Sequence, residues 1–411
     1  MQENSMENKM RPLSGIRVLG LEQYVAGPCC TMILADAGAE VIKIEPPGSG
    51  DPRRSLPPFA TNPQGEKSSG GFMRFNRNKK SLTLDLKQEK GKEIFKALLN
   101  KADVIVENLR PGTMEKLGFP YGTIREINPG IIYASISGFG KWDPLRGPYW
   151  DRPGFDIVFQ AMGGLMHNVG EKDGPPQFLG FTLVDLHTPM VTAYGIMLAL
   201  RMRDKTGLGQ YLDTAMYDCT AALNEGSVAI HSYTGEVPGR DRPRIQAPLC
   251  AFKTKDGYVA LMIPTEEMWA RLCRALQRED LIRHPQLSSG LLRGKHYDDL
   301  LAPILEEWMA QRTNEEVIRT LLRHGVPVGP SQNARDLVHC PQLSARKMIV
   351  DIPDPVGGKK KMVGSPVKLS EVPEIELNPA PSLGANNREV LGDLLGFSAG
   401  EIAALEMQKV I

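Results

Sequence analysis

A single carboxylate, Asp185, has the surroundings in this chain that most suggest chemistry. It stands within residues 180–218, at the end of an apolar, strand-like run and ahead of a long apolar helix. If Asp185 were the N-cap, its carbonyl would accept a bond from the residue four positions later, but that residue is Pro189, which has no N–H. Pro189 fits better as the first helical residue, with Thr188 as the cap. Asp185 then has either a chemical role or a local structural role near the positive helix end.

Other catalytic signatures are weak or absent in the sequence. His187 is either an acid–base group or, as we prefer, a polar side chain in the loop before Thr188. The seven histidines form no HExxH or HxH pattern, so no metal site is predicted. There is no GxSxG elbow, no P-loop and no reactive-cysteine signature. A Rossmann dehydrogenase is disfavoured because EQYVAGP offers one glycine where the dinucleotide fingerprint needs three.

Two basic groups allow either a solvated surface or an anion site. Arginine could hold a phosphate or carboxylate through two parallel hydrogen bonds. The groups are the alternating arginines of one Pro-rich loop and the lysines around the segment SLTLDL: Arg240, Arg242 and Arg244; Lys79, Lys80 and Lys87.

Bulk properties exclude several classes of protein. A chain of 411 residues predicts two domains, and a net charge of +1 argues against nucleic-acid or membrane-surface binding. The N-terminal MQENSMENKMR lacks the apolar core of a signal peptide. Six scattered cysteines indicate free thiols in a reducing cytoplasm. We therefore expect a cytoplasmic protein whose partners are small molecules, with neither nucleic acid nor membrane among them.

Alternating strands and helices predict an α/β fold with a largely parallel sheet. The first unit reads as a strand from Ile16, a helix in GPCCTMILADAG and a strand from Glu40 to Ile44. Apolar runs and one amphipathic pattern supply further elements: strands at 81–86, 104–107 and 131–136, and a helix at 89–101.

The middle of the chain has a different character. A Pro- and Arg-rich loop precedes a predicted hairpin around the turn at 256–258, and helices with one apolar face follow. We expect a large domain over residues 1–222, a smaller α+β domain over 223–335, and a return to the large domain over 336–411.

Several segments, taken in order, resemble the family III CoA-transferases, the group that includes formyl-CoA and carnitine CoA-transferases. They span residues 13 to about 408, and VENxRPG and RxRxKTGxGQ are the most specific in combination. The matching segments are GIRVLGLEQYVAGP, GAEVIKIEPPGSGD, FNRNKKSLTLDL, ADVIVENLRPGTMEKLGF, NPGIIYASISGFG, the Asp185 segment with ALRMRDKTGLGQ, HGVPVGP and SLGANNREVLGDLLGF.

The resemblance implies a fold and a reaction. The fold is a Rossmann-like, doubly wound large domain built from both chain ends, a smaller middle domain, and a homodimer whose subunits interlock like links of a chain. Asp185 matches the family's nucleophilic aspartate, and Asp156 matches a carboxylate that assists it or orients nearby groups. The implied reaction moves coenzyme A from an acyl-CoA, such as succinyl-CoA, to a free carboxylic acid. It passes through an aspartyl–acyl anhydride and an aspartyl-CoA thioester.

A carboxylate suits that reaction. With a reference pKa of about 3.9, Asp185 would be ionised at neutral pH without a base to activate it. Backbone N–H groups must stabilise the oxyanion, and Gly163, Gly164 and the GFG segment are candidates. No prosthetic group is implied, because the coenzyme A thioester is itself a substrate.

The resemblance also implies contacts to coenzyme A. Lys87 and Lys116 would meet phosphates, whereas Leu84 and Met216 would offer apolar contacts. Pro46 stands where family members often have a basic residue, and the glycine-rich loop of formyl-CoA transferase is absent. The loop Arg240–Arg244 replaces it, which suggests a substrate that bears a carboxylate. The matching positions are Gln23, Tyr24, Val25, Ala26, Leu84, Lys87, Asn108, Leu109, Lys116 and Met216.

Two other functions are compatible with this family's fold. The 2-methylacyl-CoA racemases share the aspartate but need a second acid–base group, and Phe155 occupies the place of their histidine here. A non-catalytic scaffold subunit of a hetero-oligomeric transferase would not need Asp185, which this chain retains.

Overall fold

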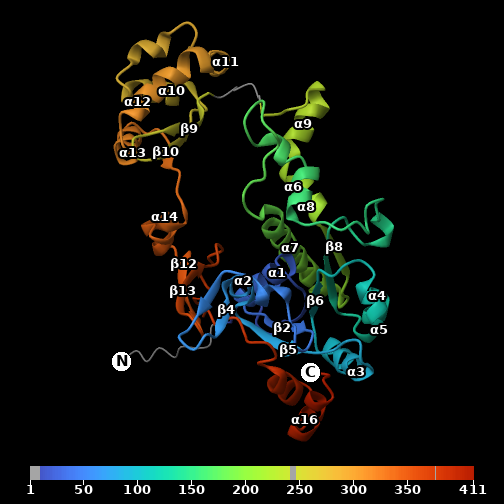
Figure 1. Ribbon diagram of the computed structural model, residues 1–411. Helices are drawn as coiled ribbons and strands as arrows, with labels where there is room; N and C mark the ends of the chain where they lie inside the picture. Colours follow the sequence, from blue (N-terminus) through green and yellow to red (C-terminus); the bar gives the residue numbers. More distant parts are fainter. Residues whose placement is uncertain (1–9, 241–246, 375) are drawn as a thin grey trace, which may run out of the picture. The chain divides into compact units, whose positions relative to one another are not determined.

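The computed structural model describes residues 10–240, 247–374 and 376–411. Two compact units can be distinguished, one from both chain ends, up to Val237 and from Ser344, and one from the middle, Pro238–Leu343 (Figure 1). The first boundary therefore falls after 237 rather than 222, and the second at 344 rather than 336. The reason is that α8 (Met216–Leu223) runs directly into α9 (Glu225–Thr234), and α8 packs on α7 of the first unit.

A six-stranded parallel sheet forms the centre of the first unit. Its strand order is β5-β2-β1-β6-β7-β8, so the order reverses between β1 and β6, as in doubly wound nucleotide-binding sheets. This confirms the predicted α/β fold. The strands are β1 (Arg17–Leu21), β2 (Glu40–Glu45), β5 (Lys79–Thr83), β6 (Val104–Glu107), β7 (Ile132–Ser137) and β8 (Tyr211–Ala215).

Apolar residues on both sides explain why these short segments form strands. Every residue of β6 (VIVE) is buried, as expected for a parallel strand covered on both faces. The strand expected at 81–86 begins at Lys79 and ends at Thr83 instead. The N–H of Leu84 still donates to the carbonyl of Glu45 in β2. The next N–H, that of Asp85, donates instead to the carbonyl of Val410 near the C-terminus, so the pairing with β2 ends there.

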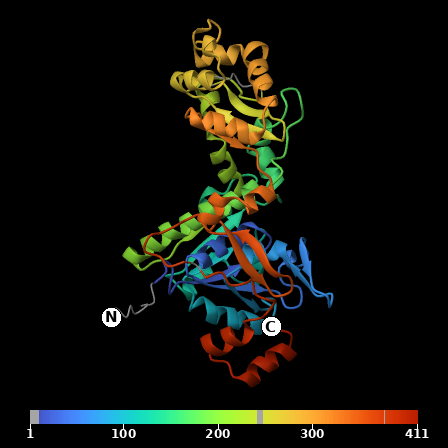
Figure 2. The same ribbon diagram turned by 90° about the vertical axis from the view of Figure 1, so that its left-hand side faces the viewer.

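Helices cover both faces of the sheet. On one face α1 (Ala26–Asp36) and α7 (Leu183–Thr206) pack against alternate residues of the strands. On the other face, α3 (Glu89–Leu99) and α5 (Tyr121–Ile127) share a core with the C-terminal α16 (Ala399–Met407). Both ribbon views show the red C-terminal helices beside α3 (Figures 1 and 2).

Helix α7 begins earlier than predicted. Leu183 is its first residue, so Asp185 lies in the first turn and Pro189 lies inside the helix rather than at its start. The apolar run before Asp185 is therefore not a strand. By length and composition α7 could cross a membrane, although 44% of its most apolar window is buried within the molecule.

The second unit is a small α+β structure. The predicted hairpin is confirmed: β9 (Leu249–Lys253) pairs antiparallel with β10 (Tyr258–Met262), and β11 (Val328–Pro330) adds a third strand. Its helices pack Trp269 and Leu305 into a separate core. They are α10 (Glu266–Ala275), α11 (Gly290–Lys295), α12 (Ala302–Ala310), α13 (Asn314–Arg323) and α14 (Ala334–Val338).

Shorter elements complete the chain. Two small antiparallel pairs accompany the first unit, and single helical turns connect the larger elements. They are β3 (Phe59–Thr61) with β4 (Lys67–Ser69), β12 (Ile349–Asp354) with β13 (Gly358–Val363), α2 (Gly70–Asn76), α4 (Thr113–Leu117), α6 (Asp156–Met162), α15 (Pro341–Ala345) and the single-turn η1 (Pro52–Ser55).

Candidate functional site

A cavity of about 530 Å³ lies where the strand order of the large sheet reverses. The crevice at this position is where open α/β sheets bind their ligands. Eight of the residues singled out from the sequence line this one cavity: Gln23, Tyr24, Val25, Ala26, Asn108, Leu109, Asp185 and Met216.

The ends of β1 and β6 are held together by a pair of side chain–backbone hydrogen bonds. The amide group of Asn108 accepts from the Gln23 N–H and donates to the Gln23 carbonyl, both at 2.9 Å. Gly27 makes this approach possible, because a Cβ there would lie 2.4 Å from the Cβ of Glu22 and 2.8 Å from Oδ1 of Asn108. The cavity floor is therefore built from backbone that only glycine permits.

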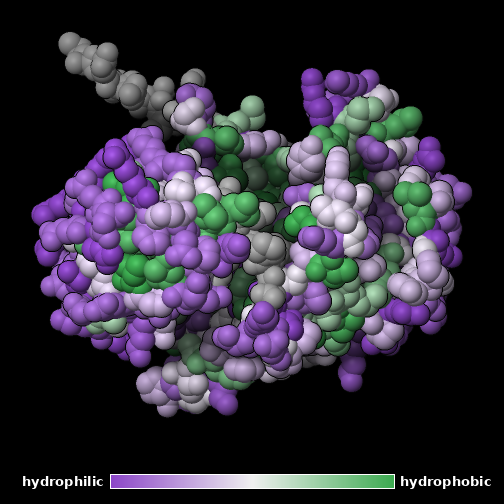
Figure 3. All heavy atoms as spheres, turned by 90° about the horizontal axis from the view of Figure 1, so that it is seen from above, coloured by the Kyte–Doolittle hydropathy of each residue, from purple (hydrophilic) through white to green (hydrophobic). Residues whose placement is uncertain are grey.

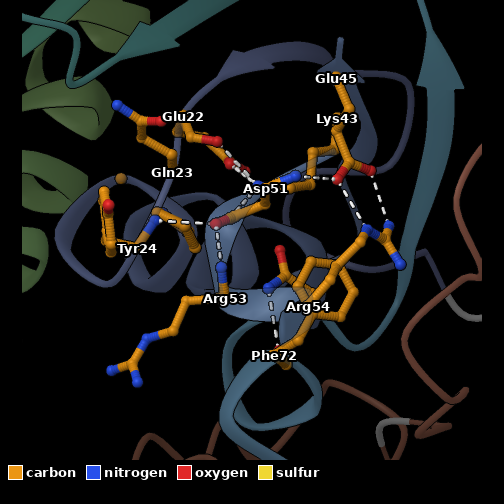
Figure 4. Close-up of polar contacts among 12 residues, drawn as sticks. Glu22, Gln23, Tyr24, Lys43, Glu45, Asp51, Arg53, Arg54 and Phe72 are labelled. Carbon is orange, nitrogen blue, oxygen red and sulfur yellow. Dashed lines mark hydrogen bonds and ion pairs between the residues drawn. The ribbon is translucent and has the colours of Figure 1, made fainter. Parts of the chain in front are cut away.

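A buried ionic network fixes the loop beside this floor (Figure 4). Lys43 is fully buried and its Nζ donates to the carboxylates of Glu22 and Asp51, the second at 2.9 Å. Lys79 reaches the other oxygen of Glu22 at 3.0 Å. Pairing of this kind is what makes a buried charge tolerable.

Asp51 connects this network to the cavity wall. Its second carboxylate oxygen, Oδ1, accepts from the N–H of Tyr24 at 3.2 Å and from that of Arg53 at 2.9 Å. Tyr24 has a positive φ of 65°, a conformation that a non-glycine residue keeps only when its surroundings impose it. The network therefore positions two cavity-lining residues.

Asp156 holds the backbone at Asp185. Asp156 is buried at the start of α6, and its Oδ2 accepts from the backbone N–H of Asp185 at 2.9 Å. Its Oδ1 accepts from the amide of Gln160, which also donates to the carbonyl of Phe181 at 3.0 Å. Asp156 thus satisfies one of the unpaired N–H groups at the start of α7 from a different helix.

The charge environment makes Asp185 an unusual aspartate. Burial, and then the like charge of Asp156, raise its pKa from 3.8 to about 7, while Arg53 and Arg74 act in the opposite direction. A pKa of about 7 departs from the expectation that Asp185 is fully ionised at neutral pH, because burial and the neighbouring carboxylate disfavour its charged form. A strongly shifted pKa in a cavity is typical of functional groups.

A buried thiol, Cys29, lies within electrostatic range of Asp185. It packs with Val25, Met32 and Phe75. Burial raises the pKa of Cys29 to about 11, against a smaller opposing effect of Lys79. Cys29 is therefore protonated at physiological pH.

Three residues expected to contact coenzyme A do not line the cavity. Leu84 is buried in the core, and Lys87 and Lys116 are exposed outside the cavity wall. His187 also lies outside it. Arg242 and Arg244 fall outside the described residues.

The glycine candidates for an oxyanion site differ in their availability. The N–H groups of Gly163 and Gly164 bond to the carbonyls of Phe159 and Ala161, and that of Gly140 bonds to the hydroxyl of Ser137. Gly138, also in the GFG segment, lines the cavity. Among these, Gly138 is the candidate that lines the same cavity as Asp185.

Sequence reasoning missed Arg53, Arg110 and Arg152, which also line the cavity. The signal for Arg53 was its place two residues after the turn GSGD, which follows the buried strand ending at Glu45. Phe155 lines the cavity as well, and its ring meets that of Tyr24 edge-on with centroids 6.5 Å apart. Within the described ranges, no group of three or more His, Cys, Asp or Glu is arranged to hold a metal ion.

Comparison with known proteins gives consistent results. The family model of CoA-transferase family III matches residues 13–387. The chain is 39% identical over 398 residues to a succinyl-CoA:mesaconate CoA-transferase of Haloarcula hispanica, covering 95% of this chain and 98% of that protein. It is 34% identical to the succinyl-CoA–D-citramalate CoA-transferase of Chloroflexus aurantiacus, covering 99% of this chain and all of that one.

A solved structure is also similar. The CaiB/BaiF family protein from Brucella suis superposes with a TM-score of 0.82 at 32% identity, covering 93% of this chain and 99% of that one.

Proposed function

Because this chain belongs to CoA-transferase family III and is an enzyme of the CoA-transferase type, we propose that Asp185 is its nucleophile. The observation that carries the proposal is the position of the Asp185 carboxylate in the cavity at the sheet's point of reversal, beside the end of β1. The proposed reaction moves coenzyme A from succinyl-CoA to a free carboxylic acid, as the names of the relatives suggest.

The proposed steps conserve the energy of the thioester bond. The Asp185 carboxylate attacks the thioester carbonyl, forming a mixed anhydride and releasing CoA thiolate. The thiolate attacks the aspartyl carbonyl, releasing the donor acid and leaving an aspartyl-CoA thioester. The acceptor carboxylate attacks that thioester, and the thiolate then returns to the new acyl group, which regenerates Asp185.

The raised pKa of Asp185 has two opposing consequences for this role. A more basic carboxylate is intrinsically more nucleophilic, as thiolates are. A smaller fraction of it is ionised at neutral pH. Holding the reacting groups in place must supply much of the acceleration, on the order of 7–11 kcal/mol. The bond from Asp185 N–H to Asp156 serves this positioning.

We place the coenzyme along the loops after β1 and β6. The N-terminus of α1 has no side-chain cap, and Val25 and Ala26 at this end line the cavity, so the positive end of the helix dipole lies beside it. Arg110 also lines the cavity and is a further candidate for a phosphate. Contacts from Leu84, Lys87 and Lys116 remain predictions. We propose no prosthetic group.

We further propose that the enzyme is a cytoplasmic homodimer with interlocked subunits, with neither nucleic acid nor membrane as a partner. Large apolar side chains are exposed along α7, including Met190, Tyr194 and Leu198. Tyr233 on α9 is 91% exposed. Hydrophobic areas interrupt the hydrophilic surface on the face shown in Figure 3. Surfaces of this composition usually mark interfaces.

A racemase would need a proton-transfer group that the cavity does not offer at Phe155, whose ring carries no acidic proton. No feature of the site favours that second function.

The test is chemical trapping of the intermediates on Asp185. The enzyme is incubated with succinyl-CoA and a panel of acids, treated with hydroxylamine or borohydride, and digested for mass spectrometry. We expect a modification at Asp185 and a loss of transfer on the order of 10⁴-fold in Asp185→Asn. Asp204→Asn, an exposed aspartate on the same helix, is the matched control. Transfer by Asp185→Asn at the wild-type rate, without an adduct at residue 185, would refute the mechanism.

A further inference from the structure

Two adjacent arginines of the first unit, Arg53 and Arg54, differ in whether their guanidinium groups have partners. Arg54 is fully used: its guanidinium donates to both oxygens of Glu45, at 2.8 and 2.7 Å, and to the carbonyl of Pro381 at 3.0 Å. Arg53 lines the cavity of Asp185 and has no ion pair with any described residue. Its Nε is buried without a hydrogen-bond partner. A buried donor without a partner is costly, so it calls for a ligand.

The backbone of Arg53 is fixed although its side chain is unpaired. Its N–H bonds to Asp51 at 2.9 Å, and its carbonyl accepts from the hydroxyl of Ser69 at 3.0 Å. Figure 4 shows the guanidinium pointing away from the Lys43–Glu22–Asp51 network, on the side of Tyr24. The loop therefore presents the guanidinium group of Arg53 from a fixed backbone. Such a group can bind a carboxylate through two parallel hydrogen bonds.

A second guanidinium, Arg74 on α2, accompanies Arg53. The pKa of Arg74 is lowered by partial desolvation and then by the like charge of Arg53, so the two cations lie near each other. Both also act on the Asp185 carboxyl group. Neither forms an ion pair with Asp185 in the described structure: Arg53 lines the cavity together with Asp185, whereas Arg74 lies outside the lining and acts on Asp185 through its charge.

We propose that Arg53, assisted by Arg74, binds the distal carboxylate of a dicarboxylic substrate. This is the carboxylate that is not joined to coenzyme A. The enzyme would then select dicarboxylic acids and their mono-CoA thioesters over monocarboxylic ones. This inference rests on the proposed function, because it assumes that the acyl group reacts at Asp185. An arginine beside the nucleophile faces the acyl end of the thioester, whereas the phosphates of coenzyme A lie at the far end of the pantetheine arm.

The experiment compares two isotope-exchange reactions that differ by one group. Succinyl-CoA with labelled succinate and butyryl-CoA with labelled butyrate have acyl chains of equal length, and only the first has a distal carboxylate. Exchange is measured at about pH 8.5, where Asp185 is mostly ionised even if its pKa rises when the cation is removed. The quantity compared is the ratio of kcat/KM for succinyl exchange to kcat/KM for butyryl exchange.

We expect Arg53→Gln to lower this ratio about 10- to 100-fold, the loss typical of a charge-assisted hydrogen bond. Arg53→Lys should recover part of the ratio, since lysine keeps the positive charge but lacks the paired N–H donors of the guanidinium group. Arg74→Gln should act in the same direction with a smaller effect, because Arg74 is exposed. Arg125→Gln, which changes an exposed arginine on α5 outside this cavity, should leave the ratio unchanged.

An equal fall of both exchanges in Arg53→Gln, or an unchanged ratio, overturns the inference, because Arg53 would then act only through Asp185 or through the coenzyme. Borohydride trapping at Asp185 and an unaltered unfolding midpoint show that the variant is folded. The proposed function is tested separately, since Asp185→Asn must abolish both exchanges. If both exchanges survive in Asp185→Asn, the proposed nucleophile itself is wrong.

Discussion

Two carboxylates with different tasks stand at the centre of the site. Asp185 faces the cavity, whereas Asp156 is buried and both of its oxygens accept hydrogen bonds. Burial raises the pKa of Asp185, and the like charge of Asp156 raises it further. The residue that holds the backbone N–H of Asp185 therefore also contributes to the pH at which Asp185 becomes charged.

The activity of the free enzyme should therefore depend on pH around neutrality. We expect kcat/KM to rise as the pH increases through about 7, since the ionised form of Asp185 attacks. Asp156→Asn should move the midpoint to lower pH, because the amide oxygen still accepts the Asp185 N–H but carries no charge. Initial rates between pH 5 and 8 provide the profile, with Asp204→Asn as control. A midpoint that stays in place in Asp156→Asn would contradict this assignment.

The same raised pKa predicts a gain in stability when the charge is removed. The folded pKa of Asp185, about 7, exceeds its unfolded value of 3.8, so ionisation of Asp185 opposes folding as the pH rises between these values. Asp185→Asn should thus be more stable than wild type at pH 8, by about 1–2 kcal/mol after allowance for partial exposure. The difference should vanish below about pH 4.

Urea unfolding at both pH values measures the effect of Asp185→Asn. A variant less stable than wild type at pH 8 would show that the Asp185 charge is compensated within the folded protein.

At the scale of elements, the parallel strands could be predicted from the sequence, but the start of α7 could not. The strand Val104–Glu107 was identified to the residue, because a short apolar run between turns has few alternatives. The prediction for α7 used Pro189 as its first residue. In the structure the helix extends six residues further, with its first turn held by Asp156, 29 positions away in sequence. No local pattern contains that contact.

The candidate site residues also divide into those that local sequence predicts and those that depend on distant contacts. Gln23 and Asn108 follow the ends of β1 and β6, the two strands that flank the reversal point, so the residues named from the resemblance line the cavity at that point. Arg53 was missed because its importance depends on Asp51 being fixed by Lys43, which sequence spacing does not reveal.

The buried network should be the most sensitive element of the site. Asp51→Ala leaves Lys43 without one of its two carboxylates and frees the backbone at Tyr24 and Arg53. Loss of one partner of a buried pair costs about 3–5 kcal/mol. Urea unfolding should show that loss, and the KM for acyl-CoA should rise. Asp143→Ala, at an exposed aspartate, is the control, and equal unfolding midpoints for the two variants would disprove the role of the network.

For the whole molecule, both chain ends build one unit, and the C-terminal segment completes its core. Leu405 and Val410 pack in the same cluster as Phe95. The two-unit division has its boundaries at 238 and 344, since helix α9 extends the first unit beyond the expected limit at residue 222 and up to the Pro-rich loop.

The assembly should be a dimer in solution. We expect sedimentation equilibrium to give twice the chain mass of 45.3 kDa. Interlocked subunits should also fail to exchange when tagged and untagged dimers are mixed, because separation requires unfolding. Tyr194→Glu, on the exposed apolar face of α7, should reduce the yield of dimer, whereas Asp204→Asn on the same helix should not. A species of one chain mass at micromolar concentration would contradict the proposal.

Burial of Cys29 has a consequence for the durability of such an enzyme. An anhydride or thioester on Asp185 is an acylating agent, and a thiolate within reach would capture the acyl group permanently. The pKa of about 11 keeps Cys29 as a thiol, which is a poor nucleophile. Close packing against Val25 and Phe75 further shields its sulfur. If Asp185 carries such an intermediate, the burial of Cys29 behind Val25 thus protects the enzyme from acylating itself.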